Sequence, residues 1–277
     1  MAEAALAAET IGAALAWGRS RLEVAGCETP RLDAELLLAF VLGVGRERLV
    51  LDRDLGLGAL ERARFASMVE RREGREPVAY ILGRKEFRRL TLCVDRRVLI
   101  PRPETELLVE VGLGLAGGAR VADVGTGSGA VALALADERP DLMVRGLEID
   151  SAALSVAVAN RDRLGLAVGF AAADLLDDGV YDAVLANLPY VPVGAALAPE
   201  IARFEPPGAL FAGGDGLDVV RRLVSVVVRR RPLPLLALEI GSEQARAVKE
   251  LLSAAGFGRV EALRDLAGLD RVVVGSP

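Results

Sequence analysis

A glycine-rich loop, Asp123-Val124-Gly125-Thr126-Gly127-Ser128-Gly129, constrains the fold more than any other stretch of the chain. It follows an apolar run over residues 120–124 and opens a helix, and the order strand, glycine loop, helix is typical of a doubly wound sheet. Gly125, Gly127 and Ala130 also satisfy the loose pattern of dinucleotide-binding loops. The loop therefore predicts an α/β sheet with a ligand-binding turn, and by itself it leaves the ligand open.

Apolar runs and helical spacing continue this pattern to the end of the chain. We expect strands over 120–124, 144–149, 168–173, 181–186, 233–240, 259–263 and 270–275, and helices over 129–138, 151–164, 217–230 and 243–255. Only residues 265–269 separate the last two strands, so these should pair antiparallel, because a parallel pair needs a crossover. Seven strands that end in an antiparallel hairpin are the usual plan of an S-adenosylmethionine-dependent methyltransferase.

The first part of the chain shows helical spacing only. We expect one helix from Thr10, with Ile11, Leu15, Leu22 and Val24 near one face, a second over Pro30–Leu42, with Leu32, Leu36, Leu37 and Phe40 at helical spacing, and a third over 58–72. Residues 77–83 are interpreted as a linker, 86–100 as a hairpin and 104–115 as a helix. The predicted organisation is a helical domain at 1–84, a hairpin linker at 85–105 and an α/β domain at 106–277.

The tetrapeptide Asn187-Leu188-Pro189-Tyr190 ends the apolar strand expected at 181–186. In an open α/β sheet, ligands bind at the carboxyl ends of the strands. The Asn187 side-chain oxygen and the Leu188 carbonyl can each accept a hydrogen bond, and Tyr190 can stack on a flat group. Two acceptors beside a ring suit a planar group that bears NH2, although a plain strand-to-loop turn would use the same residue types.

Acidic side chains follow three successive predicted strands. Asp123 favours a ligand with an ammonium group, such as the methionine half of S-adenosylmethionine; Glu148 can accept both hydroxyls of a ribose; Asp174 with Leu175 can hold an adenine by its edge and face. Taken singly, each acid could be a helix cap or a solvated group. Together they predict a cofactor site made of Asp123, Gly125, Thr126, Gly127, Ser128, Gly129, Glu148, Asp174, Leu175 and Asn187.

Composition excludes several kinds of chemistry. The 277 residues include no histidine, so a Ser-His triad and a histidine-ligated metal are impossible, and we expect no metal site. The two cysteines form no metal-like spacing, the net charge is −5, and the basic residues are scattered rather than clustered, so we expect no direct nucleic-acid partner. No apolar run approaches 18 residues and the start lacks a basic signal region, so we expect a cytoplasmic protein with no membrane partner.

Several motifs together resemble the release factor glutamine methyltransferases of the PrmC/HemK type, over nearly the whole chain. They are PVAYILG at 77–83, LIPRPETE at 99–106, the GTGSG loop, the tetrapeptide at 187–190, Glu205-Pro206 with Ala209-Leu210, Glu239-Ile240-Gly241 with Gln244, and DLAGLDR at 265–271. The family usually has Asn-Pro-Pro-Tyr, so Leu188 is a departure, and it commonly has Asp where Glu148 stands. We expect the Leu188 side chain to be incidental, because the resemblance assigns its backbone carbonyl.

The resemblance implies methylation of the glutamine amide in the Gly-Gly-Gln loop of class I peptide chain release factors, giving N5-methylglutamine for translation termination. It implies S-adenosylmethionine as the cofactor, release factors as the partners, and Asn187, Leu188, Pro189 and Tyr190 as both catalytic and substrate-binding residues. We expect residues 1–84 to recognise the protein substrate, although a stabilising cap without chemistry would use the same helices, and we expect a monomer.

Three alternatives stay open at this point. A nucleic-acid adenine-N6 methyltransferase needs the same two acceptors, and the spelling Asn-Leu-Pro-Tyr is similar to that of the ribosomal RNA dimethyladenosine enzymes. An NAD-dependent oxidoreductase would explain the glycine loop, but it leaves the tetrapeptide without a role. A non-catalytic cofactor-binding module can be dismissed only by measuring activity.

Overall fold

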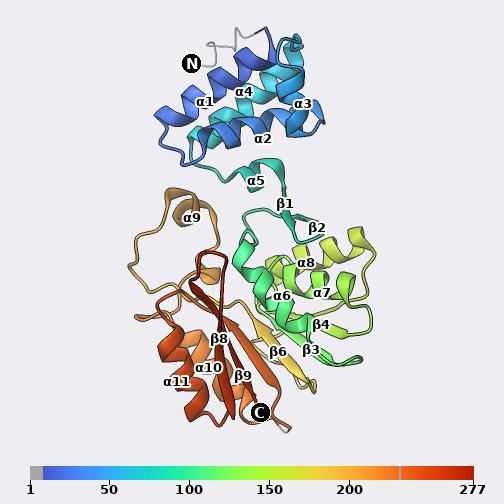
Figure 1. Ribbon diagram of the computed structural model, residues 1–277, viewed down its shortest axis with the longest axis vertical. Helices are drawn as coiled ribbons and strands as arrows, with labels where there is room; N and C mark the ends of the chain where they lie inside the picture. Colours follow the sequence, from blue (N-terminus) through green and yellow to red (C-terminus); the bar gives the residue numbers. More distant parts are fainter. Residues whose placement is uncertain (1–8, 231) are drawn as a thin grey trace. The chain divides into compact units, whose positions relative to one another are not determined.

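The computed structural model describes residues 9–230 and 232–277, which form two compact units (Figure 1). The first unit holds the described residues up to Gly83 together with 198–204, and the second holds 84–197 and 205–277. The chain therefore returns to the first unit for one short segment after most of the second has been built. Residues 1–8, part of the start that we inspected for a secretion signal, lie outside the described residues.

The first unit is helical, as expected, but contains more helices than the sequence pattern predicts. Its helices are α1 (Ile11–Val24), α2 (Pro30–Leu42), α3 (Arg46–Leu51), α4 (Ala59–Glu73), α5 (Val78–Leu82) and α9 (Pro199–Phe204). The side chain of Thr10 caps α1 by accepting from the Ala13 N–H, and α2 begins at its proline. The interpretation of 77–83 as a linker is wrong, because α5 forms there and ends at Gly83 in the left-handed conformation.

The core of the first unit gathers around Phe65, Leu37, Leu38 and Leu22, all fully buried. Two residues expected on apolar helix faces are exposed instead: Val24 at 89% and Leu32 at 37%. Val24 is the last residue of α1, where the chain turns away, so the spacing that holds for Ile11 and Leu22 ends before it.

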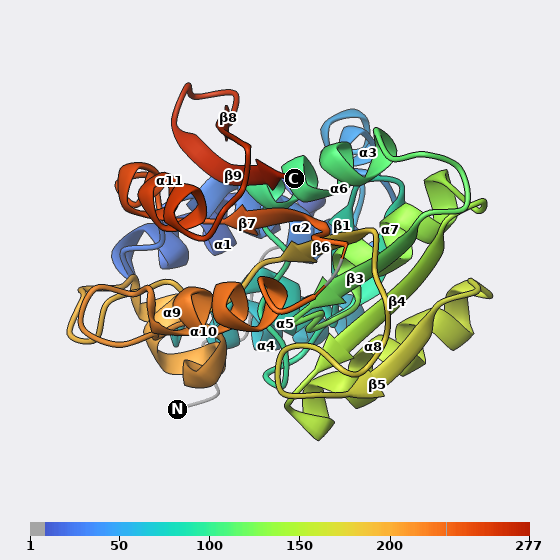
Figure 2. The same cartoon turned by 90° about the horizontal axis from the view of Figure 1, so that it is seen from below.

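The second unit contains a hairpin and a seven-stranded sheet. The hairpin is β1 (Arg84–Phe87) and β2 (Leu90–Cys93), shorter than the predicted 86–100. The sheet strands are β3 (Arg120–Val124), β4 (Met143–Glu148), β5 (Gly169–Ala172), β6 (Ala183–Ala186), β7 (Leu235–Glu239), β8 (Arg259–Arg264) and β9 (Asp270–Ser276), in the order β5-β4-β3-β6-β7-β9-β8 (Figure 2). The first five of these are parallel. The last two, β8 and β9, pair antiparallel as predicted, and β9 is also antiparallel to β7.

Helices cover both faces of this sheet because successive strand residues point to opposite sides. Val121 and Leu185 pack with α6 (Glu106–Leu113) and α7 (Ala130–Glu138), whereas Val124 and Val184 pack with α10 (Asp218–Val227) and α11 (Ala245–Ala254). The remaining helical segments are α8 (Ser151–Leu164) and the 3-10 turns η1 (Pro103–Thr105) and η2 (Pro207–Ala209). The predicted fold class is confirmed. Across the described residues, every helix is too short or too polar to cross a bilayer.

Candidate active site

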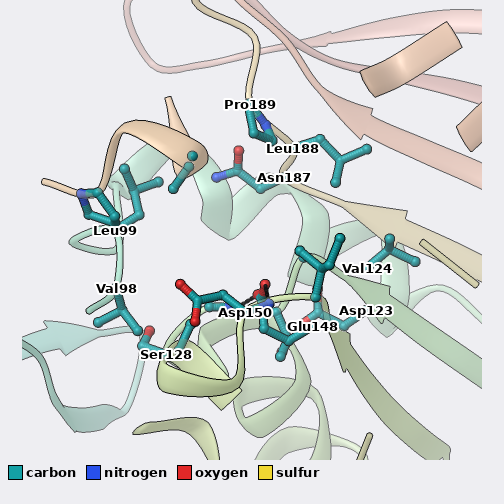
Figure 3. Close-up of a pocket in the computed structure, with 18 of the residues that line it drawn as sticks. Val98, Leu99, Asp123, Val124, Ser128, Glu148, Asp150, Asn187, Leu188 and Pro189 are labelled. Carbon is teal, nitrogen blue, oxygen red and sulfur yellow. Dashed lines mark hydrogen bonds between the residues drawn. The ribbon is translucent and has the colours of Figure 1, made fainter. Parts of the chain in front are cut away.

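A cavity of about 340 Å³ lies in the second unit, where β3, β4 and β6 end. Its walls come from seven separate stretches of the chain, and Figure 3 shows Asn187 on one side with Glu148 and Ser128 opposite. The predicted residues that line it are Asp123, Gly125, Thr126, Gly127, Ser128, Glu148, Asp174, Leu175, Asn187, Leu188 and Pro189. Gly129 and Tyr190 do not line it.

The glycine loop forms the floor of the cavity through its backbone conformation. Gly125 and Gly127 have φ angles of +70° and +55°, which L side chains rarely adopt, so the turn after β3 needs glycine there. Gly129, at φ +84°, starts α7, and a Cβ at this position would lie 2.9 Å from Leu133 Cδ1. Gly129 therefore serves the turn and its packing rather than the wall of the cavity.

Asp123 lies beneath this loop with 2% of its surface exposed. Its Oδ2 accepts hydrogen bonds from the Thr126 hydroxyl at 2.6 Å and from the Ala132 N–H at 3.1 Å. Burial raises the pKa of the Asp123 carboxyl to about 6, although both hydrogen bonds act in the opposite direction. A cation placed beside this buried carboxylate would stabilise its charged form, as the predicted contact with an ammonium group requires.

Glu148 ends β4 and holds the loop from the other side. Its Oε2 accepts from the Gly127 N–H at 2.9 Å and its Oε1 from the Asp150 N–H at 3.0 Å. Each carboxylate oxygen has a further lone pair, so both can also accept from the hydroxyls of a diol. The backbone contacts fix the orientation of the carboxylate, and its use by a ribose stays a prediction.

Asp174 and Leu175 follow β5 and carry different contacts. Asp174 Oδ2 accepts from Arg222 Nη2 at 2.6 Å, an ion pair in which both side chains are about half exposed. Leu175 is buried and has a φ of +70°, which turns the chain sharply beside the cavity. Arg222 also lines the cavity, so any adenine held here would meet an ion pair rather than a free carboxylate.

The tetrapeptide after β6 presents Asn187, Leu188 and Pro189 to the cavity. The Asn187 Nδ2 donates a hydrogen bond to the Thr105 hydroxyl at 3.0 Å, which leaves Oδ1 as the end of the amide that can accept from a ligand. Tyr190 is half-buried, its hydroxyl donates to Glu239 Oε1 at 3.4 Å, and its carbonyl accepts from Gln244 Nε2.

The Leu188 side chain has a packing role that the sequence did not indicate, and our expectation that it is incidental to catalysis stays a prediction. It is 5% exposed and packs in the core with Val124 and Val220. Its Cδ2 would lie 3.1 Å from a Cβ built on Gly125, so it fills the space directly against the glycine loop. The family motif indicates a role for the Leu188 carbonyl only. The side-chain contact with Gly125 depends on the fold and cannot be seen in the motif.

Three polar side chains that we did not predict organise the walls. Glu205 is 3% exposed, accepts a hydrogen bond from the Ile100 N–H and forms an ion pair with Arg102. These two contacts join the motif at 99–106 to the segment that follows α9. Asn160, fully buried on α8, bonds the backbone of Cys93 and Ser128. Thr105 lines the cavity itself. The motif at 99–106 was the available signal for Thr105 and Arg102, but nothing in the pattern around Asn160 indicated a role.

The residues present fit S-adenosylmethionine. Asp123 offers a buried carboxylate for the ammonium group, Glu148 a fixed carboxylate for the ribose, and the apolar side chains of Leu175 and Ile149 line the cavity beside Asp174 for a flat base. S-Adenosylmethionine is the cofactor that this combination of groups would bind.

A parallel sheet with a final antiparallel strand, a glycine loop after its first strand and acids at the next two strand ends define a class I methyltransferase. Family models match "PrmC N-terminal domain" over residues 13–83 and "Methyltransferase small domain" over 103–204. The chain is 42% identical to the release factor glutamine methyltransferase of Rhodospirillum rubrum, over 99% of this chain and 87% of that one. It is 39% identical to that of Geobacter sulfurreducens, over 96% of each. The chain belongs to the release factor glutamine methyltransferase family.

A solved structure agrees with the fold. The hMettl16 catalytic domain, in complex with MAT2A 3'UTR hairpin 6, superposes with a TM-score of 0.57 at 18% identity, over 67% of this chain and 74% of that one. At this identity the likeness concerns the fold alone.

Proposed function

We propose that this chain transfers a methyl group from S-adenosylmethionine to the side-chain amide nitrogen of the glutamine in the Gly-Gly-Gln loop of class I peptide chain release factors, giving N5-methylglutamine. The names of relatives that are about 40% identical over nearly the whole chain support the reaction and its substrate class. The structural observation that carries the proposal is the orientation of Asn187, whose NH2 end is bonded to Thr105 and whose oxygen is left for a substrate NH2.

The chemistry needs positioning more than a strong base. An amide nitrogen is a poor nucleophile because its lone pair is delocalised into the carbonyl. Asn187 Oδ1 and the Leu188 carbonyl hold both amide hydrogens, so that the nitrogen lone pair faces the methyl group, and this gain is one of orientation and electrostatics. When bound, S-adenosylmethionine supplies that methyl group on a positively charged sulfur. In the transfer, the N–C bond would form as the S–C bond breaks, the sulfonium would leave as a neutral thioether, and the nitrogen would then lose a proton to solvent.

Pro189 and Tyr190 complete the substrate side in this proposal. Pro189 lines the cavity beside Asn187, and the ring of Tyr190 is fixed at its hydroxyl by Glu239. We expect the two rings to wall the amide plane and the space beside them to accept a glutamine side chain but to reject a nucleobase by size. Two glycines before the glutamine have no side chains to obstruct the approach of its backbone.

Mass spectrometry of methyl incorporation tests this function. An intact release factor should be methylated on the Gly-Gly-Gln glutamine, and its Gln→Asn variant should not, because that amide is one methylene short. A short peptide with the same loop should react slowly, since it lacks the docking surface. Incorporation into the Asn variant at the normal rate, or into RNA but not release factor, would overturn the proposal.

Asn187→Ala tests the assigned acceptor. We expect turnover to fall by the equivalent of about 2–4 kcal/mol of barrier, the cost of one preorganised group, while the calorimetric Kd for S-adenosylmethionine changes much less. Near-normal turnover at saturating release factor would show that Asn187 does not bind the amide.

The remaining assignments follow the same reaction. Residues 1–84 recognise the release factor, 85–105 connect and also place Thr105 in the wall of the cavity, and 106–277 bind the cofactor and transfer the methyl group. The enzyme acts as a cytoplasmic monomer without contacting nucleic acid. The family model over 13–83 supports a separate domain in this segment, and the recognition role is part of the proposal. Sedimentation of the chain alone and with a release factor would test both the monomer and the pairing.

A further inference from the structure

Thr105 links the candidate acceptor Asn187 to a buried carboxyl. Its side chain is 4% exposed at the end of η1, its hydroxyl donates to Glu239 Oε2 at 2.6 Å, and its oxygen accepts from Asn187 Nδ2 at 3.0 Å. Glu239, the last residue of β7, is 2% exposed. The three side chains come from three separate elements and form one continuous chain of hydrogen bonds.

The direction of these hydrogen bonds follows from the inventory of donors. A threonine hydroxyl has one proton, and a carboxylate can only accept, so the Thr105 proton is committed to Glu239. The oxygen of Thr105 then faces Asn187 with its lone pairs, and only the NH2 end of the Asn187 amide can pair with it. The Asn187 oxygen must therefore point away from Thr105, toward the cavity.

We propose that Thr105 and Glu239 are positioning residues that fix the amide of Asn187 with its oxygen toward the substrate. This inference rests on the proposed function, because it matters for catalysis only if Asn187 accepts from the substrate amide. An Asn187 amide turned by half a rotation would set its own NH2 against the substrate NH2, two donors without an acceptor.

The charge on Glu239 controls this arrangement. Burial raises the pKa of Glu239 to about 7, and the negative charge of Glu104 adds to the rise, whereas the hydrogen bonds from Thr105 and Tyr190 and the positive charge of Arg271 oppose it. A protonated Glu239 can donate a hydrogen bond to the Thr105 oxygen, which frees the Thr105 proton to turn toward Asn187. Thr105 can then pair with either the NH2 or the oxygen of the Asn187 amide. The ordered arrangement belongs to the ionised carboxylate, so it is lost as pH falls through about 7.

The experiment compares Thr105→Val, Thr105→Ser and Glu239→Gln in the full chain with a release factor as substrate. At saturating cofactor, Thr105→Val should lower kcat on the order of 10-fold to 100-fold, and Thr105→Ser, which keeps the hydroxyl, should stay within about threefold of the wild type. The wild-type kcat should fall as pH drops below about 7, and Glu239→Gln, whose side chain does not titrate, should flatten this limb. The Kd for S-adenosylmethionine should change less than about threefold in each variant.

Thr91→Val is the matched control. Thr91 also donates its hydroxyl to a glutamate, Glu86 Oε2 at 2.8 Å, but this bond is exposed on the hairpin. Its loss should leave kcat and its pH profile unchanged.

A readout without turnover separates this inference from the proposed function. Nitrogen-15 NMR of the Asn187 side-chain NH2 should show proton exchange that is strongly slowed at pH 8 relative to a free asparagine amide at the same pH, less slowed at pH 6, and not slowed at either pH in Thr105→Val. Equal exchange in Thr105→Val and wild type, equal kcat in Thr105→Val and Thr105→Ser, or an unchanged acid limb in Glu239→Gln would overturn the positioning role. A wild type that shows this exchange pattern but methylates no release factor would overturn the proposed function and leave the positioning of Asn187 standing.

Discussion

At the scale of single residues, Leu188 shows how one position can carry two roles through different atoms. Its carbonyl is assigned to the substrate, whereas its buried side chain packs against Gly125 of the loop beneath the cofactor cavity. A substitution that keeps the carbonyl can therefore still disturb the site.

Leu188→Ala should lower the free energy of unfolding by about 2–5 kcal/mol and raise the Kd for S-adenosylmethionine, because it opens a space against the glycine loop. Leu188→Pro, which restores the commoner family residue, should lose part of this stability but keep kcat at saturating cofactor. Urea unfolding and calorimetry measure both effects. The matched control is Leu266→Ala, since Leu266 is fully exposed and should change stability by less than about 0.5 kcal/mol. Equal stability of the two alanine variants would refute the packing role.

The sequence predicted the residues of the site whose chemistry is visible locally. Asp123, Glu148 and Asn187 stand directly beside strand ends, where an acid or amide suggests a ligand contact. Thr105 and Glu239 could not be predicted in the same way, because their roles depend on contacts between residues 82 and 134 positions apart. Glu239 belongs to one of the family motifs, but only the fold shows that it is buried and faces Thr105.

At the scale of elements, the boundaries that were predicted best are those with a local stop signal. The helix at Pro30–Leu42 begins at a proline and ends before Gly43 in the left-handed conformation, and the helix at Ser151–Leu164 ends before Gly165 in the same way. Helices α3, α5 and α9 have only five or six residues, too few for helical spacing to show. Of these, α9 matters most, because it joins a unit built mainly from residues more than a hundred positions earlier.

Glu200 holds α9 in the first unit, and Glu200→Gln should destabilise that unit. Glu200 Oε1 lies 2.9 Å from Arg72 Nη2 and 2.7 Å from Arg75 Nη2, and all three side chains are at least 84% buried. Removing the charge leaves Arg75 without its carboxylate, whereas Arg72 keeps Asp33, so we expect a loss of about 1–3 kcal/mol. The single tryptophan, Trp17, packs against Phe65 in this unit, and its fluorescence reports unfolding there.

Glu250→Gln is the control for this loss. Glu250 pairs with Arg246 on α11, where both side chains are largely exposed, so its contribution should be below about 0.5 kcal/mol. If Glu200→Gln unfolds at the same urea concentration as Glu250→Gln, the buried ion pairs do not hold α9.

At the scale of the whole molecule, the sequence contains no histidine, so the dependence of the folding stability on pH near neutrality comes from fewer groups. Among the described residues, Asp123 and Glu239 are the carboxyl groups whose pKa burial raises to about 6 and about 7. Other carboxyls, such as Asp182 and Asp215, are held near a pKa of about 2 by their arginine partners, so they finish titrating well below pH 5. Between pH 5 and 7.5, these two buried groups should dominate the change in stability.

The ligand-free protein should therefore be more stable at pH 5 than at pH 7.5. Both carboxyls have folded-state pKa values above their unfolded values, so the folded state binds more protons in this range and stability falls as pH rises. Burial raises the pKa of Asp123 from 3.8 to about 6 and that of Glu239 from 4.5 to about 7, which corresponds to roughly 3 kcal/mol per group. Roughly half of the Asp123 effect and roughly two thirds of the Glu239 effect fall within the window. Urea unfolding followed by circular dichroism at several pH values measures the change of the free energy of unfolding with pH.

Two variants separate the contributions of the two carboxyls. Asp123→Asn should remove the change in stability that is centred near pH 6, and Glu239→Gln should remove the change near pH 7. Saturating S-adenosylmethionine should suppress the Asp123 part alone, because its ammonium group favours the charged carboxylate. A free energy of unfolding that rises with pH, or a slope that survives both substitutions, would show that other groups set the stability of this fold.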